Sequence, residues 1–350
     1  MKQRNIPIAT RRQMLTLMSG AAGYALLGAR PSFAAGATGT QMVPQNRSQT
    51  EPDPRSTPLA VVATTGMIAD AVTQIAGPFV QVRGLMGSGV DPHSYRQTRS
   101  DIVAMVRADL VLWHGLYLEA QMEEFLLKLG HRRAAVAVAE SLPASVLMPY
   151  GQYENRFDPH VWMAPMLWAD VITAVEAALI AAMPQHVEAL AQAAARHRAE
   201  IAALHGYATA ALDQIPDAAR VLLTAHDAFG YFGRAYGLEV IGIQGISTQS
   251  EAGLNRIGQL VDMLVARDIR AVFVESSVSD RNIRALIEGC AAQGHRLAIG
   301  GELFSDAMGP PGTYEATYIG MLDHNITTIA RALGADVPPR GMNGQLGGHA

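Results

Sequence analysis

Cysteine is nearly absent from this sequence of 350 residues, because Cys290 is the only one. A single thiol excludes an intramolecular disulfide, so a protein exported to an oxidising compartment must fold without one. Cys290 lies in the stretch RNIRALIEGCAAQG, which predicts a helix. We therefore expect it to be a small buried hydrophobic residue and not a reactive thiol.

Several functional motifs are also missing. The chain has no CxxC and no HExxH, and its GSG at residues 87–89 lacks both the lysine of a P-loop and the full glycine pattern of a dinucleotide-binding turn. The first 34 residues hold five of the 27 basic residues and no acid, so the remainder has 22 basic against 31 acidic residues, a net charge of −9. Nucleotide binding and nucleic-acid binding are therefore not expected.

The N-terminus has the layout of a secretory signal. Basic residues precede an apolar stretch from Met14 to Leu27, and Ser32-Phe33-Ala34 resembles a cleavage site. Paired Arg11 and Arg12 are typical of a twin-arginine export signal. We therefore predict a signal peptide at residues 1–34 and a periplasmic location, with an uncleaved membrane anchor as the alternative. No cysteine stands directly after the signal, which argues against a lipid anchor.

The polar, proline-rich residues 35–57 predict a flexible leader. After it, short aliphatic runs alternate with helical stretches, which indicates parallel strands covered on both faces. We predict an α/β fold with two Rossmann-like lobes, at residues 58–183 and 217–340, joined by one long rigid helix at 184–216. No segment after the signal is expected to be long and apolar enough to span a membrane. The runs that predict strands are LAVVATT, VQVRGLM, LVLWHG, AAVAVAE, RVLLTAH, EVIGIQG, AVFVESS and RLAIGGE.

The predicted connecting helix is bounded by Pro184 and Pro216 and is rich in good helix formers. The alternative is an ordinary surface helix that breaks near Gly206. Solvated side chains are expected for the three histidines in this segment, which are His186, His197 and His205.

Four polar side chains follow predicted strands. His93 and His160 occur in repeated Asp-Pro-His frames 67 residues apart, His226 directly follows VLLTA, and Asp306 follows the last strand. Loops at the carboxyl ends of parallel strands converge on one crevice, so we expect these residues to meet there. A proline before each of the first two histidines stiffens the backbone that presents the ring.

Three imidazoles and one carboxylate suit a divalent cation such as Zn²⁺ or Mn²⁺. A single histidine at a strand end is more often a hydrogen-bonded structural residue, but four such side chains at equivalent positions favour a metal site. His114 also follows a strand and is a weaker candidate, either as a ligand or as a residue that lines the crevice. Glu275 either hydrogen-bonds a ligand imidazole or caps the next helix. The histidines not assigned to the metal are His131, His186, His197, His205, His295, His324 and His349.

From about Leu59 onward, the sequence resembles the zinc/manganese-type (cluster A-I) solute-binding proteins that supply metal to ABC importers. Long collinear segments carry the resemblance: DPHSY, GLYLE, DPHVW, AHDAFGYFGRAYGLEVIGIQGIST, VFVESSVS and GELFSDAMGPPGTYEATYIGMLDHN. The resemblance implies metal ligands at His93, His160, His226 and Asp306. It also implies two lobes joined by a long helix, a metal held between them, and docking to a membrane permease.

The sequence departs from that family at several points. The family often has asparagine at His114 and an acid at Gln249, and many zinc-specific members have a long His-rich loop that is absent from this sequence. We expect a monomeric carrier of zinc or manganese. The alternative is a metal-dependent hydrolase that uses the same His₃Asp site with Glu275 or Asp227 as general base, and a surface protein with only a structural role is a third possibility.

Overall fold

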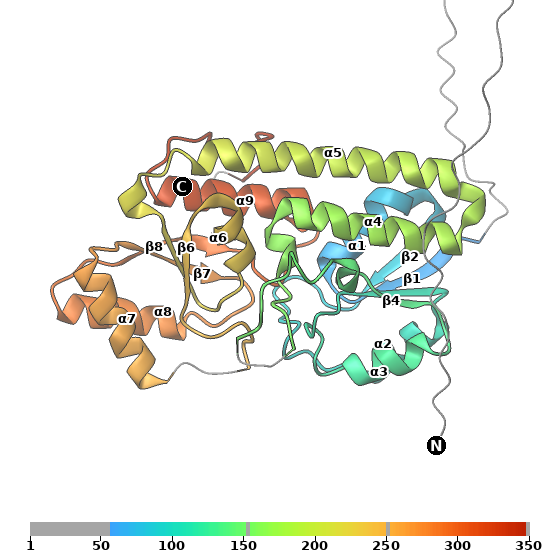
Figure 1. The fold of residues 1–350 in the computed structure, drawn as a ribbon, viewed down its shortest axis with the longest axis horizontal. Coiled ribbons are helices and arrows are strands. Elements are labelled where there is room, and N and C mark those ends of the chain that lie inside the picture. The colour runs from blue at the N-terminus through green and yellow to red at the C-terminus, as the bar shows by residue number, and fades with distance from the viewer. Residues whose placement is uncertain (1–56, 152–154, 250–252, 348–350) are drawn as a thin grey trace, which may run out of the picture. The chain divides into compact units, whose positions relative to one another are not determined.

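The computed structural model describes residues 57–151, 155–249 and 253–347, which contain eight β-strands and nine α-helices (Figure 1). The predicted export signal at 1–34 lies outside these ranges, as does all but the last residue of the predicted leader at 35–57. Seven of the eight strands lie within the aliphatic runs that predict them, and β8 extends one residue beyond the run RLAIGGE, to Leu303.

The N-terminal lobe is built on a parallel sheet with the strand order β2-β1-β3-β4. The interior strand β3 is buried along its whole length, as expected for a strand covered on both faces. The parallel register brings the carboxyl ends of these strands to one edge of the sheet. The strands are β1 (Leu59–Ala63), β2 (Val80–Gly84), β3 (Leu110–Trp113) and β4 (Ala135–Ala137).

Helices cover both faces of this sheet (Figure 1). Buried side chains of α1 and α4 pack on one face, and those of α2 and α3 pack on the other. Helix α2 begins with a capping box, in which Thr98 and Asp101 each satisfy a backbone N–H of the first turn. The helices are α1 (Gly66–Ala76), α2 (Arg99–Arg107), α3 (Glu123–Gly130) and α4 (Pro165–Ala182).

The C-terminal lobe repeats the parallel α/β pattern. Strand β5 pairs with β6 and lies beside β7, which pairs with β8. The strands are β5 (Val221–Thr224), β6 (Glu239–Gly242), β7 (Ala271–Glu275) and β8 (Ala298–Leu303). The helices are α6 (Gly230–Tyr236), α7 (Leu254–Ala266), α8 (Arg281–Ala292) and α9 (Tyr318–Ala332). The predicted α/β fold with two lobes of parallel strands is confirmed.

One long helix, α5 (Val187–Leu212), contacts helices of both lobes (Figure 1). It has 26 residues, which corresponds to about 39 Å at 1.5 Å per residue. It packs on α1 and α4 of the N-terminal lobe and on α9 of the C-terminal lobe. The helix continues through Gly206, so the alternative of a break there is wrong. It begins after a 3₁₀ turn at Pro184–His186 and is therefore shorter than the predicted segment.

The expectation of solvated histidines along this segment is wrong for His197, which is only 3% exposed. Since α1, α4 and α9 all pack against α5, more of its circumference is covered than on a surface helix. His186 and His205 are half-buried. The first stacks on the ring of Phe79 at 4.1 Å, and the Nδ1 of the second lies 3.0 Å from the hydroxyl of Tyr236.

Helix α4 corrects the expectation that no segment after the signal is apolar enough to span a membrane. Its 18 residues have a mean hydropathy of 1.5, so by length and composition alone the helix could span a membrane. In the structure it contributes buried residues such as Trp168, Ile172 and Val175 to the main hydrophobic core and packs against α5. Core packing therefore accounts for its apolar composition.

Cys290 lies on α8 and is fully buried, as predicted. It packs in the core of the C-terminal lobe together with residues of α7 such as Leu264. Burial raises the pKa of its thiol, which further disfavours the reactive thiolate.

Candidate metal centre

The four side chains predicted to bind metal come together in the structure. His93, His160, His226 and Asp306 each offer a donor atom, and these atoms all lie within 4.8 Å of one another. Two come from each lobe. None of the four residues is more than 3% exposed.

The distances between the donor atoms match those between ligands around one small ion. His93 Nε2 lies 3.2 Å from His160 Nε2, His160 Nε2 lies 3.3 Å from Asp306 Oδ1, and His226 Nε2 lies 3.2 Å from Asp306 Oδ2. Ligands about 2.0–2.1 Å from a tetrahedral zinc ion are separated from each other by about 3.3 Å. The four groups therefore surround a volume of the size that such an ion needs.

Three donor atoms of this cluster lack any hydrogen bond to the described residues. They are His226 Nε2 and both carboxylate oxygens of Asp306, and all three are buried. Buried polar atoms are nearly always paired, because leaving one unpaired costs about 1–3 kcal/mol. A cation between the lobes would satisfy all three atoms.

Carboxylates on the opposite side of two rings fix how those imidazoles face the site. Asp158 Oδ1 lies 2.7 Å from Nδ1 of His160, and Glu275 Oε2 lies 2.5 Å from Nδ1 of His226. A proton held at Nδ1 by a carboxylate leaves the lone pair at Nε2 for a metal. The hydrogen bond expected of Glu275 is present, and its partner is His226, one of the four predicted ligands.

The two Asp-Pro-His frames share a local structure. The carboxylate of Asp91 accepts the backbone N–H of His93 at 2.8 Å, and that of Asp158 accepts the backbone N–H of His160 at 2.9 Å. The prolines are therefore not alone in stiffening these frames, because the two aspartates, which the sequence analysis leaves out, also hold the backbone. The Asp-x-His pattern itself indicates this contact, because an aspartate commonly accepts a hydrogen bond from the backbone two residues later.

Burial and neighbouring charges change the pKa values of the imidazoles in different directions. Burial, with the nearby His160 and His226 rings, lowers the pKa of His93 to about 4, although the charge of Asp306 opposes this. Burial also acts to lower the pKa of His160, but the charge of Asp158, its hydrogen bond to Nδ1 and the charge of Asp306 outweigh it and raise the value to about 9.

The pair formed by His226 and Asp306 is shifted most strongly. Burial opposes both charged forms, yet Glu275 and Asp306 hold the pKa of His226 well above its usual value. The imidazoles of His226 and His160 in turn hold the pKa of Asp306 well below its usual range. The site therefore favours an ionised carboxylate that needs positive charge beside it, supplied either by protons or by a metal.

His114 is not one of the four clustered donors. It is fully buried, its ring lies edge-on to that of Trp162 and parallel to that of Trp168, and its Nε2 lies 2.7 Å from the carbonyl oxygen of Pro159. Burial lowers the pKa of its imidazole to about 3, so the ring is neutral. His114 therefore supports the loop that carries His160.

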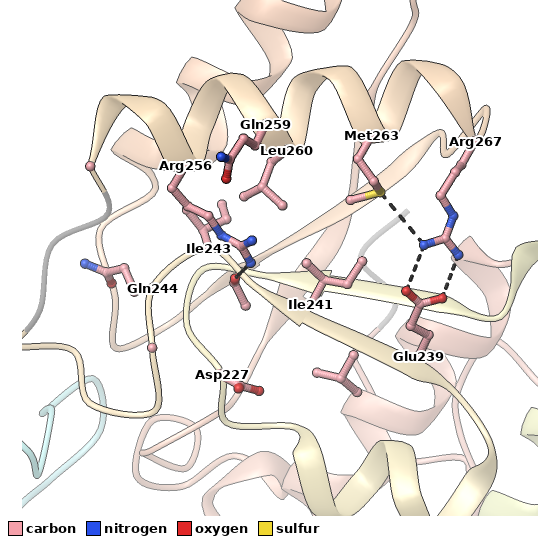
Figure 2. A pocket seen from close by; sticks show the side chains of 14 residues that line it. Asp227, Glu239, Ile241, Ile243, Gln244, Arg256, Gln259, Leu260, Met263 and Arg267 are labelled. Atoms are coloured by element: carbon pink, nitrogen blue, oxygen red, sulfur yellow. Dashed lines mark hydrogen bonds and ion pairs between the residues drawn. The ribbon is translucent and has the colours of Figure 1, made fainter. Parts of the chain in front are cut away.

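Neither residue considered as a general base for hydrolysis is suitably placed. Both oxygens of Glu275 already accept hydrogen bonds from His226. Asp227 lines a separate hollow of about 680 Å³ between β6 and α7, together with Arg256 and Arg267 (Figure 2). None of the four clustered residues lines that hollow, and nothing in the site supports the hydrolase alternative.

Comparisons with known proteins show the family of this chain. Residues 61–332 match the family described as zinc-uptake complex component A, periplasmic. The manganese-binding lipoprotein MntA of Bacillus subtilis is 47% identical over 275 residues, which cover 79% of this chain and 90% of the relative. The zinc-binding protein TroA of Treponema pallidum is 46% identical over 273 residues, which cover 78% of this chain and 88% of that protein. The solved structure of this periplasmic zinc-binding protein aligns with a TM-score of 0.77 and 45% identity, over 79% of this chain and 99% of the other.

Proposed function

The chain belongs to the family of periplasmic zinc-uptake component A proteins, and from this membership we propose that it is a solute-binding protein for a divalent transition metal. It captures zinc or manganese outside the cytoplasm and delivers the ion to the permease of an ABC importer. The observation that carries this proposal is the set of buried donor atoms at His226 and Asp306 that have no hydrogen-bond partner among the described residues.

We propose His93, His160, His226 and Asp306 as the ligands. Three imidazole nitrogens are favourable for zinc, and the two oxygens of Asp306 give the additional hard donor that manganese accepts. The named relatives include both a manganese-binding and a zinc-binding protein. Intrinsic affinity for such a site is greater for zinc than for manganese, so we expect tighter zinc binding in a direct competition.

The ligand set is divided between the lobes, so closing them around an ion completes the site. Helix α5 packs against helices of both lobes, and a continuous helix resists the wide bending that a loop hinge allows. The movement between the metal-free and metal-bound forms should therefore be small. We further propose that residues 58–183 and 217–340 form the two lobes, with 184–216 as the connecting segment.

For the wider setting we propose a monomer that acts outside the cytoplasm. The paired arginines Arg11 and Arg12 support export by the twin-arginine route, with cleavage after Ala34. Replacing both arginines with lysine should then block export, and cell fractionation would measure this. Export that continues unchanged would contradict the twin-arginine route and leave the metal-binding proposal intact.

The central experiment is calorimetric titration of the metal-free protein with zinc and, separately, with manganese. We expect one ion per chain, with zinc displacing manganese in competition. A hydrolase assay on the zinc-loaded protein should give no turnover of ester or phosphoester substrates. Failure to bind either metal at a one-to-one ratio would contradict the proposed function.

A further inference from the structure

The loop that follows β6 in the C-terminal lobe contacts the loop that carries His93 in the N-terminal lobe. The hydroxyl of Thr248 donates to Asp91 Oδ2 at 2.6 Å, and the side-chain amide of Gln249 donates to the backbone carbonyl of His93. Gln121 of the N-terminal lobe donates to the other end of that amide, Gln249 Oε1, at 3.4 Å. We call Thr248 and Gln249 the latch.

The acceptor used by Thr248 is the carboxylate that already shapes the His93 turn. Asp91 Oδ1 accepts the backbone N–H of His93 at 2.8 Å, while Asp91 Oδ2 accepts the hydroxyl of Ser94 at 2.7 Å as well as that of Thr248. One carboxylate thus joins the backbone of a proposed ligand to the opposite lobe. Hydrogen bonds to a charged acceptor are the stronger kind, at about twice the strength of neutral ones.

The loop that carries His160 is held to the C-terminal lobe in a different way. Trp162 Nε1 donates to the carbonyl of Ser305, Tyr231 donates to the carbonyl of Asp158, and Tyr318 donates to the carbonyl of Trp162, each at 2.8 Å. All three hydrogen bonds are buried. Three large aromatic side chains therefore fix this loop in the buried part of the interface between the lobes.

The latch has no such protection. Thr248 is half-buried and Gln249 is exposed, so both can exchange their protein partners for water at low cost. Of the two N-terminal ligand loops, the one that carries His93 is thus held across the lobes by contacts that open readily.

We propose that Thr248 and Gln249 are positioning residues that hold His93 in the ligand set and thereby determine how fast the bound metal leaves. This inference rests on the proposed metal-binding function. Neither side chain touches the metal position, so weakening the latch should raise the dissociation rate and leave the association rate nearly unchanged. Weakening the latch should raise the dissociation rate of zinc and also that of manganese.

The test uses the full exported chain loaded with zinc and mixed rapidly with the coloured chelator 4-(2-pyridylazo)resorcinol. Thr248→Val removes the hydroxyl at nearly constant shape and should release zinc roughly tenfold faster, since it breaks a hydrogen bond to a charged group. Gln249→Met removes the amide and should release zinc about fivefold faster. Thr248→Ser keeps a hydroxyl and should restore most of the slow release.

Matched controls make the same chemical changes away from the interface. Thr73→Val and Gln214→Met each remove a hydrogen bond to a backbone carbonyl four residues earlier, at exposed positions. Both should release zinc at the wild-type rate. Far-ultraviolet circular dichroism of each variant checks that it is folded.

The outcomes separate the latch from the function on which it rests. If the wild-type protein binds neither zinc nor manganese, the proposed function fails. If the wild type binds one zinc ion and both latch variants release it at the wild-type rate, the latch proposal is overturned alone. If Thr248→Val does not fold, Gln249→Met decides the question, because its exposed side chain can be replaced without disturbing the core.

Discussion

The carboxylate of Glu275 accepts two hydrogen bonds from His226, one from the backbone N–H at 2.9 Å and one from Nδ1 at 2.5 Å. The two residues are 49 positions apart in the sequence, at the carboxyl ends of the neighbouring strands β5 and β7. A single side chain therefore fixes both the backbone of His226 and the direction of its ring. As a result, Nε2 of His226 faces Asp306.

Replacing Glu275 with glutamine should weaken metal binding by about 10- to 100-fold without unfolding the protein. The amide keeps the shape of the side chain but loses the charge that favours a proton at Nδ1 of His226. Chelator competition with zinc measures the change. Glu288→Gln, at an exposed position on α8, is the matched control, and equal affinities for the two variants would contradict the role assigned to Glu275.

Alanine at His226 or Asp306 should remove metal-dependent stabilisation. A ligand that binds only the folded state stabilises it by about 4 kcal/mol at 1,000 times its dissociation constant. The wild-type melting temperature should therefore rise on adding zinc, while those of the two variants should stay constant. His131→Ala, at the exposed end of α3, should behave as the wild type. A normal rise in both site variants would exclude these residues as ligands.

Metal affinity should fall as the pH is lowered from about 8 to about 6, since protons compete with the metal for imidazole. In the metal-free site the pKa of His160 is about 9 and that of His226 is held well above its usual value, so at neutral pH both rings are imidazolium ions that carry a second proton at Nε2, beside Asp306. His93, whose pKa is about 4, is neutral there. Binding must displace the two protons, so the logarithm of the affinity should rise with pH at a slope of about two.

Titration calorimetry in buffers with different ionisation enthalpies counts the protons released. Two protons per zinc ion at neutral pH is the expected result. A count of zero, together with an affinity that does not change with pH, would contradict the charge arrangement described for His160 and His226.

Two glycines in helices should respond in opposite ways to alanine. A Cβ at Gly320 on α9 would lie 1.9 Å from the carbonyl oxygen of Tyr314, so Gly320→Ala should lower the free energy of unfolding by about 2–3 kcal/mol. A Cβ at Gly206 on α5 would meet no atom within 4 Å. Gly206→Ala should therefore raise the free energy of unfolding by about 0.5–1 kcal/mol. Urea unfolding of the metal-free protein measures both changes, and changes of the same sign would contradict this packing.

The strands and the four clustered residues were accessible to sequence reasoning for a physical reason. Strands such as LVLW at 110–113 are buried on both faces, so they appear as continuous apolar runs. Parallel strands bring their carboxyl ends to one edge, so polar side chains after different strands are expected to meet. That rule predicts that His226 and Asp306 lie close together, although no contact between them can be read from the sequence.

Contacts between distant segments were not accessible in this way. His197 looked like a surface residue because the pattern of α5 alone does not reveal that helices of both lobes pack against it. The apolar α4 exceeded the limit for a membrane span because a core helix has the same composition. The contact of Gln249 with the His93 carbonyl joins residues 156 positions apart, and no local pattern marks such a pair.

The small volume enclosed by the four donor groups limits the chemical form of the cargo. Their donor atoms lie within 4.8 Å of one another, and none of the residues is more than 3% exposed. With the metal held by these four groups as proposed, the site has room for a bare ion and none for an organic molecule attached to it. Metal held by citrate, a peptide or a siderophore must first be stripped of that molecule. We therefore expect loading to follow the concentration of uncomplexed ion in the surroundings and not the total metal content.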